Sequence, residues 1–390
     1  MINWINFLHI YQPPKQNEYI FHQVARESYF EIAKFFDEYD GLKLTMNLSG
    51  SLLEQFIAYR YDRLLEDFAR AFKSGELELV GSAMYHPILP LLSDAEIERQ
   101  ILADERIKKS VFGASYARHG FYLPEMAYSR RVAELLDRMG FEWIILDEIS
   151  LTGKLDGLDR NKAYRIKGLR LKAVFRDREI SNQFVPEKIR ELSERLKGQD
   201  SSVVTATDGE LYGHRHQDFY NKTKEAFTDS NIRSLQVSEF VARCGENGLD
   251  EIDPVTSCWE ATEADLACGN PFPYWDDADN VIQQKLGDFG RFAAALVEEN
   301  CGDENHQVAQ GLLDQGVASC HLWAASGKRS AVWKDLIWNP DIIENGNLFF
   351  IKAVRSLREL ETQKRMEAET RFLEITGLIW EFHWNKFYNS

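Results

Sequence analysis

The stretch that decides the fold is KLTMNLSGSLLEQFIAYRYDRLLEDFARAFKSGELELVG, residues 43–81. It begins with a run typical of a β-strand, residues 43–48, and ends with another, residues 76–81. Between these runs, apolar residues recur at the spacing of one helix face: Leu64, Leu65, Phe68 and Phe72. A strand, a helix and a second strand in this order predict a right-handed βαβ unit with parallel strands.

The same alternation repeats along the first two thirds of the chain. Segments with helical spacing separate seven strand candidates, at residues 2–9, 43–48, 76–81, 119–123, 142–147, 171–176 and 202–208. About seven such units fit a closed or nearly closed (β/α) barrel better than a doubly wound sheet. No strand candidate is followed by the GxGxxG pattern of a dinucleotide site. We therefore predict an α/β fold with a barrel over residues 1–254.

The pattern changes from about residue 255 onward. Long helical stretches at 279–300, 304–318 and 346–390 replace the strand signals. Seven of the nine tryptophans also fall in this part. No Gly/Ser-rich or Pro-rich linker separates it from the barrel. We expect a C-terminal helical region, residues 255–390, packed on the barrel.

The charge balance restricts the class of partner. The chain has 46 Lys and Arg against 62 Asp and Glu, for a net charge of −16, and it shows no strongly basic run. This balance disfavours binding to nucleic acid and to anionic lipid. A neutral substrate is the partner most compatible with it, and the oligomeric state is left open.

The N-terminal segment and the cysteines bear on the compartment. MINWINFLHIYQPP has neither a basic region nor a cleavage site of small residues, so we expect no signal peptide. No window of about 18 uninterrupted apolar residues occurs. The five cysteines are odd in number and form no CxxC pair, which argues against a disulfide framework. The expected location is the cytoplasm.

Polar and otherwise unusual residues collect where the apolar strand runs end. They are His9, Gln12, Asn47, Gly81, Ser82, Glu125, Asp147, Glu148, Arg176, Asp177, Asp208 and Glu210. In a parallel barrel all strands open their carboxyl ends on one face, and that face carries the active site. This clustering indicates an enzyme that uses carboxylates.

Two of these carboxylates stand out, although each also has a plain structural explanation. Glu125 follows Pro124 at a strand end, but glutamate is also common in the first turn of a helix. Asp208 ends the apolar run VVTAT, but an Asp-Gly pair is also a turn signal. Cleavage of a glycoside needs two carboxyl groups, one ionised and one protonated, on either side of the bond. Glu125 and Asp208 are candidates for such a pair.

Several motifs then carry a resemblance to a known family. HIYQPP (9–14), LELVGSAMYHPILPLL (77–92), FYLPEMAYS (121–129) and TATDGELYGHRH (205–216) resemble, in this order, the first four regions of glycoside hydrolase family 57. FRDREISNQF (175–184) and GNPFPYWDDADN (269–280) also look like sequence of this α-glucan-acting family.

The resemblance implies a (β/α)7 barrel, an incomplete form of the TIM barrel, with a C-terminal helical part, a retaining mechanism and no metal or other cofactor. By position, Glu125 matches the nucleophile and Asp208 the general acid/base. His9 matches a residue at the reactive subsite. We expect the two carboxyls to lie about 5–5.5 Å apart, with the charge of Glu125 raising the pKa of Asp208.

Further residues are predicted to contact an α-glucan or maltooligosaccharide. They are His9, Gln12, Asp147, Arg176, Asp177, Glu210, Trp275 and Trp323. His9 and Asp147 are candidates for bonds to ring hydroxyls, and Arg176 for orienting a carboxylate. Trp275 and Trp323 could stack on glucose faces, but packing in a helical core is the explanation we favour for both.

Alternatives remain open at this stage. His9, Asp208, His214 and His216 could bind a metal, as in a metal-dependent carbohydrate hydrolase or deacetylase. A non-catalytic carbohydrate-binding protein is another reading. Within the family, we favour an α-amylase-like hydrolase, with 4-α-glucanotransferase close behind and glucan branching enzyme as a third activity. Lid loops and acceptor subsites decide among them.

Overall fold

The computed structural model describes residues 1–216, 219–245, 249–330 and 335–387. The chain divides into two compact units. The first comprises Met1–Met84 and Leu89–Trp259, and the second comprises Tyr85–Ile88 and Glu260–Ser390. The domain limits expected from the sequence, 1–254 and 255–390, stay a prediction.

Among its described residues, the first unit contains all seven predicted strands and three further short ones. The strands are β1 (Ile2–Ile10), β2 (Leu44–Leu48), β3 (Leu77–Leu79), β4 (Gly120–Tyr122), β5 (Trp143–Asp147), β6 (Tyr164–Ile166), β7 (Lys172–Arg176), β8 (Ser201–Asp208), β9 (Ile232–Leu235) and β10 (Glu251–Ile252). The unpredicted strands are β6, β9 and β10, which have three, four and two residues. Their sequences, YRI, IRSL and EI, lie outside the longer apolar runs from which the other strands were predicted.

Seven parallel strands close into a barrel. One sheet has the order β3-β2-β1-β8, with β9 also paired to β1, and the other has the order β10-β6-β7-β5-β4. Two seams join these sheets. Gly81, just after β3, exchanges backbone hydrogen bonds of 2.9 Å with Gly120 and Tyr122 of β4, and Asp177, just after β7, donates to Val204 of β8 at 2.8 Å. The predicted (β/α)7 barrel is therefore confirmed.

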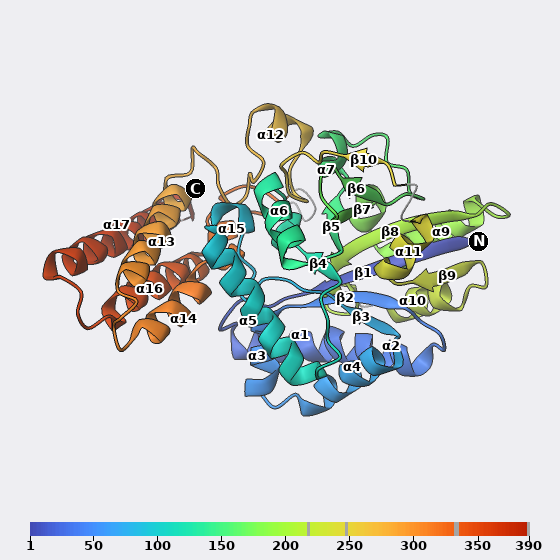
Figure 1. Ribbon diagram of the computed structural model, residues 1–390, viewed down its shortest axis with the longest axis horizontal. Helices are drawn as coiled ribbons and strands as arrows, with labels where there is room; N and C mark the ends of the chain where they lie inside the picture. Colours follow the sequence, from blue (N-terminus) through green and yellow to red (C-terminus); the bar gives the residue numbers. More distant parts are fainter. Residues whose placement is uncertain (217–218, 246–248, 331–334, 388–390) are drawn as a thin grey trace. The chain divides into compact units, whose positions relative to one another are not determined.

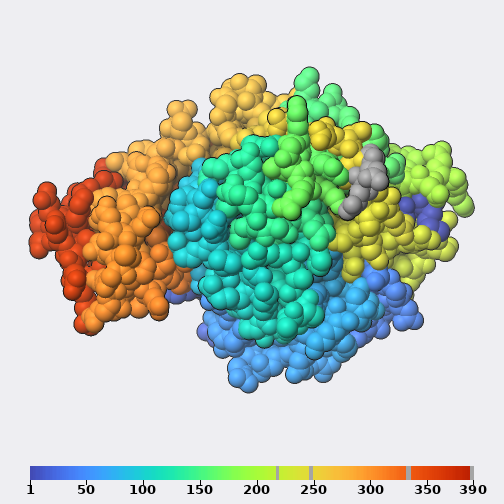
Figure 2. All heavy atoms as spheres, viewed as in Figure 1, coloured from blue at the N-terminus to red at the C-terminus, as the bar shows by residue number. Residues whose placement is uncertain are grey.

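Helices cover the outside of the barrel (Figure 1). The helical segments of the first unit are α1 (Glu18–Val24), η1 (Ala25–Tyr29), α2 (Phe30–Glu38), α3 (Gly50–Ala58), α4 (Asp62–Ser74), η2 (Leu89–Leu91), α5 (Asp94–Phe112), η3 (Pro124–Met126), α6 (Arg130–Met139), α7 (Ile149–Thr152), α8 (Arg178–Ser181), α9 (Val185–Arg195), η4 (Gly209–Leu211), α10 (Phe219–Thr228) and α11 (Val237–Cys244). Figure 2 shows part of this cover as a continuous cyan to green surface.

Local signals start and stop these helices. Ser93 and Glu96 form a capping box at the beginning of α5, which satisfies two backbone N–H groups. Helix α6 begins after Ser129, whose side chain accepts from the Val132 N–H, and ends at Gly140 in the left-handed conformation. Among the helices of the described ranges, not one combines the length and the apolar character needed to cross a bilayer.

The second unit is helical. It contains α12 (Glu263–Ala267), α13 (Val281–Glu299), α14 (His306–Gly316), α15 (Ser319–Trp323), α16 (Pro340–Ser356) and α17 (Thr362–Phe387). The predicted stretch 346–390, whose last three residues lie outside the described ones, is interrupted between α16 and α17. Arg365 stabilises this break, because its guanidinium donates to the carbonyls of Leu357, Arg358 and Leu360 at 2.7, 2.8 and 3.0 Å. Such a contact between side chain and backbone has no signature in helical periodicity.

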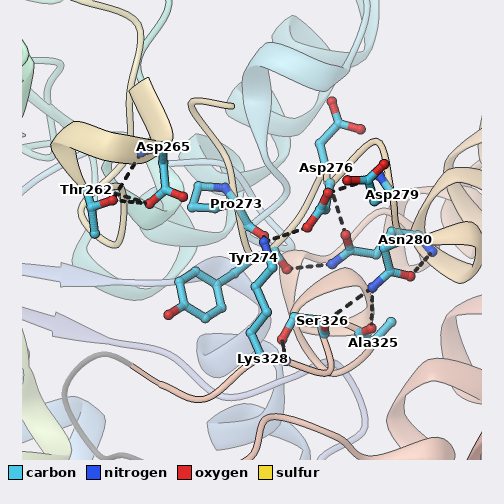
Figure 3. A network of polar contacts seen from close by, with 12 residues as sticks. Thr262, Asp265, Pro273, Tyr274, Asp276, Asp279, Asn280, Ala325, Ser326 and Lys328 are labelled. Carbon is cyan, nitrogen blue, oxygen red and sulfur yellow. Dashed lines mark hydrogen bonds and ion pairs between the residues drawn. The ribbon is translucent and has the colours of Figure 1, made fainter. Parts of the chain in front are cut away.

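A polar network ties the 269–280 segment to the loop after α15 (Figure 3). Lys328 donates to the Pro273 carbonyl at 2.8 Å, and Asn280 donates to the carbonyls of Ala325 and Ser326 at 2.8 and 3.3 Å. Asn280 also caps α13 by accepting from the Gln283 N–H. These bonds give the 269–280 motif a role in holding the second unit together.

Candidate active site

The carboxyl ends of β1, β2 and β8 bring three polar residues together. His9 pairs in register with Asn47 on one side and with Asp208 on the other. The His9 ring is buried, at 4% exposure, and its Nδ1 lies 3.0 Å from the Asn47 amide nitrogen. Because that amide nitrogen is a donor, Nδ1 accepts and Nε2 carries the proton. In this tautomer Nε2 is the hydrogen-bond donor of the ring.

Glu125 occupies a strained turn. It lies in η3 with φ 59° and ψ 17°, and Met126 beside it also has a positive φ of 49°. Two consecutive non-glycine residues in this region cost about 1–3 kcal/mol each and persist only where their surroundings hold them. Backbone bonds from Met126 to Leu123 and from Ala127 to Pro124, at 2.7 and 3.0 Å, hold the turn. Strain of this kind is typical of functional sites.

Trp259 contacts Glu125, and sequence reasoning did not single it out. Its indole N–H donates to Glu125 Oε2 at 2.9 Å, and its ring lies under the Arg176 guanidinium at 5.1 Å. Trp259 follows Glu125 by 134 positions. Nothing in the local pattern around either residue predicts this contact.

Tyr122 lies within electrostatic reach of both predicted catalytic carboxylates. Burial raises the pKa of Tyr122 well above its ordinary value, and the charges of Glu125 and Asp208 add to this rise. The Tyr122 ring also stacks on His9, with 4.5 Å between ring centroids. The structure therefore gathers Glu125, Asp208 and His9 around one tyrosine.

Burial raises the pKa of Asp208, while the positive charges of Arg215 and Arg176 oppose that rise. The sequence-based expectation named a different cause, the charge of Glu125. Desolvation disfavours the ionised form of any carboxyl group, so burial alone has the expected direction. Asp208 is thus suited to holding a proton.

Glu210 is a buried carboxyl close to Asp208. Its Oε1 accepts from the Tyr29 hydroxyl at 2.5 Å and from the Gln12 amide at 3.0 Å. Burial and the neighbouring charge of Asp208 raise the pKa of Glu210 to about 7. Gln12 and Glu210, both predicted to contact the substrate, therefore bond to each other.

Asp147, Arg176 and Arg178 form a buried ion cluster. Asp147 has no exposed surface, and its Oδ2 accepts from Arg176 at 2.6 Å while its Oδ1 accepts from Arg178 at 2.7 Å. Arg176 also donates to the Ala206 carbonyl of β8 at 2.9 Å. Both carboxylate oxygens of Asp147 are thus occupied by protein groups, which leaves it poorly placed for the predicted bond to a sugar hydroxyl.

Asp177 is likewise engaged within the protein. Its side chain accepts from the Ile180 N–H at 2.9 Å and so caps α8, and it forms an ion pair of 2.5 Å with Arg160. It is 2% exposed. This burial and these bonds favour a structural role for Asp177.

The two tryptophans predicted as sugar platforms both belong to the second unit. Trp275 is 1% exposed and its ring meets that of Tyr274 edge to face, which agrees with core packing. Trp323, the last residue of α15, is 38% exposed.

His214 and His216 contact different partners. At Gly213 the backbone lies so close to Glu27 that an added Cβ would be 1.8 Å from the Glu27 carbonyl oxygen. His214 Nδ1 then lies 2.5 Å from the Glu27 carboxylate, whereas the His216 ring packs on Phe184 at 4.6 Å. Within the ranges that the structure describes, no group of three or more His, Cys, Asp or Glu side chains is arranged to hold a metal ion.

Comparison with known proteins finds similarity to a 4-α-glucanotransferase, an α-amylase and a branching enzyme. A 4-α-glucanotransferase of Thermococcus kodakarensis and an α-amylase of Pyrococcus horikoshii are each 26% identical over 286 residues, which is 68% of this chain. The chain spans less than half the length of these relatives, 43% and 44%. The crystal structure of a branching enzyme from Pyrococcus horikoshii has the same fold, with a TM-score of 0.67, 15% identity, and coverage of 97% of this chain and 95% of that one.

The family assignment rests on a longer match. The sequence profile described as "Glycosyl hydrolase family 57" matches residues 2–253. This range contains the seven barrel strands, Glu125 and Asp208. Because the match covers more than half of the 390 residues, the chain belongs to glycosyl hydrolase family 57.

Proposed function

We propose that this protein is a retaining glycoside hydrolase that acts on α-1,4-linked glucans, with Glu125 as nucleophile and Asp208 as general acid/base. The observation that carries the proposal is the position of these two carboxyls around Tyr122, with Asp208 partly buried and its pKa raised by desolvation. Such a pair, one ionised and one protonated, is what a retaining mechanism requires. The names of the relatives support an α-glucan as substrate.

The reaction then has two steps. In the first, a carboxylate oxygen of Glu125 attacks the anomeric carbon, the glycosidic C–O bond breaks, and Asp208 gives its proton to the departing oxygen. A glycosyl ester on Glu125 results. In the second step, ionised Asp208 accepts a proton from water while the water oxygen attacks the same carbon and the ester bond breaks. Two inversions restore the α configuration, and both carboxyls return to their starting state.

The surrounding residues take three kinds of role. His9 and Glu210 are the residues that we assign to sugar hydroxyls, and Gln12 holds the Glu210 carboxylate. The positive charge of Arg176 acts on Asp208. Its guanidinium also lies over the ring of Trp259, which donates to the Glu125 carboxylate. Asp147 and Asp177 hold this framework instead of contacting sugar, because their oxygens already accept bonds from the protein.

The names of the relatives support a second candidate activity. The two relatives of equal identity carry different names, 4-α-glucanotransferase and α-amylase. In transfer, a sugar hydroxyl replaces water in the second step, and the rest of the chemistry is unchanged. Branching differs only in which hydroxyl of the acceptor attacks.

Incubation with maltopentaose distinguishes these activities. Hydrolysis yields only shorter products and new reducing ends, transfer yields products longer than maltopentaose, and branching adds α-1,6 linkages detectable by NMR. Glu125→Gln should abolish product formation, whereas Glu142→Gln, at an exposed position before β5, should not. Equal product formation by Glu125→Gln, or none by the wild type, would defeat the proposal.

A further inference from the structure

Trp259 holds Glu125 at two points. Its indole N–H donates to the Glu125 carboxylate at 2.9 Å, and its backbone N–H donates to the Glu125 main-chain carbonyl at 3.2 Å. One contact fixes the carboxylate and the other fixes the peptide group. Trp259 therefore constrains both the direction of the side chain and the turn that carries it.

The turn needs such a constraint. Glu125 and Met126 both have left-handed backbone conformations, which are unfavourable for residues with a Cβ. Strained residues stay in place only where surrounding contacts over-determine them. The backbone bond from Trp259 is a contact to this turn from outside its own segment, so it adds to the local bonds that hold Glu125.

Arg176 fixes the tryptophan in turn. Its guanidinium lies over the Trp259 ring at 5.1 Å, within the range of a cation–π interaction. Arg176 is 4% exposed, and it donates to Asp147 at 2.6 Å and to the Ala206 carbonyl at 2.9 Å, so it cannot swing away. A cation on the ring face also draws electron density from the indole, which strengthens its N–H as a donor.

We propose that Trp259 is the positioning residue of the nucleophile, and that the buried Asp147–Arg176 pair acts on Glu125 through the Trp259 ring. The inference rests on the proposed function, because it takes Glu125 as the attacking group. In this arrangement the N–H aims the carboxylate at the anomeric carbon and stabilises its negative charge. Loss of the N–H slows formation of the glycosyl ester while leaving sugar binding largely unchanged.

The rate of ester formation can be measured directly. The probe is 5-fluoro-α-glucosyl fluoride, whose leaving group needs little protonation and whose ester is slow to hydrolyse, so the added mass accumulates on the intact protein. Trp259→Phe keeps a ring under Arg176 but removes the donor. We expect labelling to slow about 10- to 100-fold, the scale of a hydrogen bond to a charged group, with half-saturation within about threefold of wild type.

A matched control removes a similar bond elsewhere in the barrel. Trp143, at the start of β5, donates its indole N–H to Ser238 at the same distance of 2.9 Å and is 1% exposed. Trp143→Phe should label at the wild-type rate. If Trp259→Phe does not fold, benzothienylalanine at position 259 replaces only the N–H by sulfur and keeps the ring shape, and the same slowing is expected.

The possible outcomes distinguish a failure of the inference about Trp259 from a failure of the proposed function. Peptide mapping that finds the label on Glu125, together with slow labelling of Trp259→Phe, supports the inference. Labelling of Glu125 at an unchanged rate in Trp259→Phe overturns it and leaves the proposed function standing. A label on another residue of the wild type defeats the proposed function, and the inference with it.

Discussion

His9 and Asp208 occupy paired positions on two adjacent parallel strands, β1 and β8, although 199 positions separate them in the sequence (208 minus 9). On its other side His9 pairs with Asn47 of β2. A shift of β1 by one residue would point His9 to the opposite face of the barrel wall. The register of β1 thus decides whether the imidazole and the Asp208 carboxyl serve the same site.

Replacement of Asp208 by Asn should reduce turnover of maltopentaose by about 100-fold or more, the scale of general acid–base assistance. Substrates with good leaving groups should lose less in the first step, because they need little protonation. Steady-state kinetics on both substrate types measure this difference. Asp200→Asn, at an exposed position just before β8, is the control. Near wild-type turnover of maltopentaose by Asp208→Asn would remove Asp208 from its role.

Glu210 should make stability depend on pH near neutrality. Its pKa is raised to about 7 in the fold, so the folded state binds a proton that the unfolded state releases near pH 4.5. This contribution is fully present below pH 4.5 and is lost as pH rises toward 7. Glu210→Gln cannot ionise, and it should gain on the order of 1–3 kcal/mol relative to wild type between pH 4.5 and 8.

Urea denaturation of both proteins at the two pH values tests this expectation for Glu210. Gln retains an oxygen that accepts from Tyr29, so the hydrogen bond itself is preserved. A stability difference that is the same at pH 4.5 and pH 8 would contradict the raised pKa.

Asp147→Asn should destabilise the barrel by about 3–5 kcal/mol, because it leaves two buried guanidinium groups without their counter-charge. Both Arg176 and Arg178 bond to this carboxylate. The free energy of unfolding from a urea titration gives the value. Asp37→Asn removes the exposed ion pair with Arg70 and should change stability by less than about 1 kcal/mol. Equal effects of the two substitutions would show that the buried cluster is not stabilised by its charges.

His216→Ala should leave activity within about tenfold of wild type, because the ring packs on Phe184. The measurement is turnover of maltopentaose before and after dialysis against a chelator. Complete loss of activity on chelation, reversed by zinc alone, would favour the metal-dependent hydrolase instead.

The reaction should release the α-anomer from an α-glucan, as NMR recorded before mutarotation can detect. The corresponding geometric expectation is a separation of about 5–5.5 Å between the carboxyls of Glu125 and Asp208, against about 6.5–9.5 Å for an inverting pair. Initial formation of the β-anomer would exclude the assignment of Glu125 as a nucleophile.

The sequence by itself determined the strand and helix order of the barrel. Strands such as β8 and helices such as α4 follow from the spacing of apolar residues, which reflects burial of one face of a local segment. The same pattern located Glu125 and Asp208 at strand ends. Strands β6, β9 and β10 were not predicted, because they lie outside the longer apolar runs and take strand geometry by pairing with other segments.

Only the tertiary structure decided how the candidate site residues are used. In the sequence, Asp147 is identifiable only as a polar residue at the end of a strand. Closure of the barrel buries it between two arginines. Trp259 contacts Glu125 although 134 positions separate them in the sequence. Burial, and not a neighbouring negative charge, raises the pKa of Asp208. Periodicity reports which face of a segment is buried. The partners and the solvation of a side chain depend on segments that fold together from far apart in the chain.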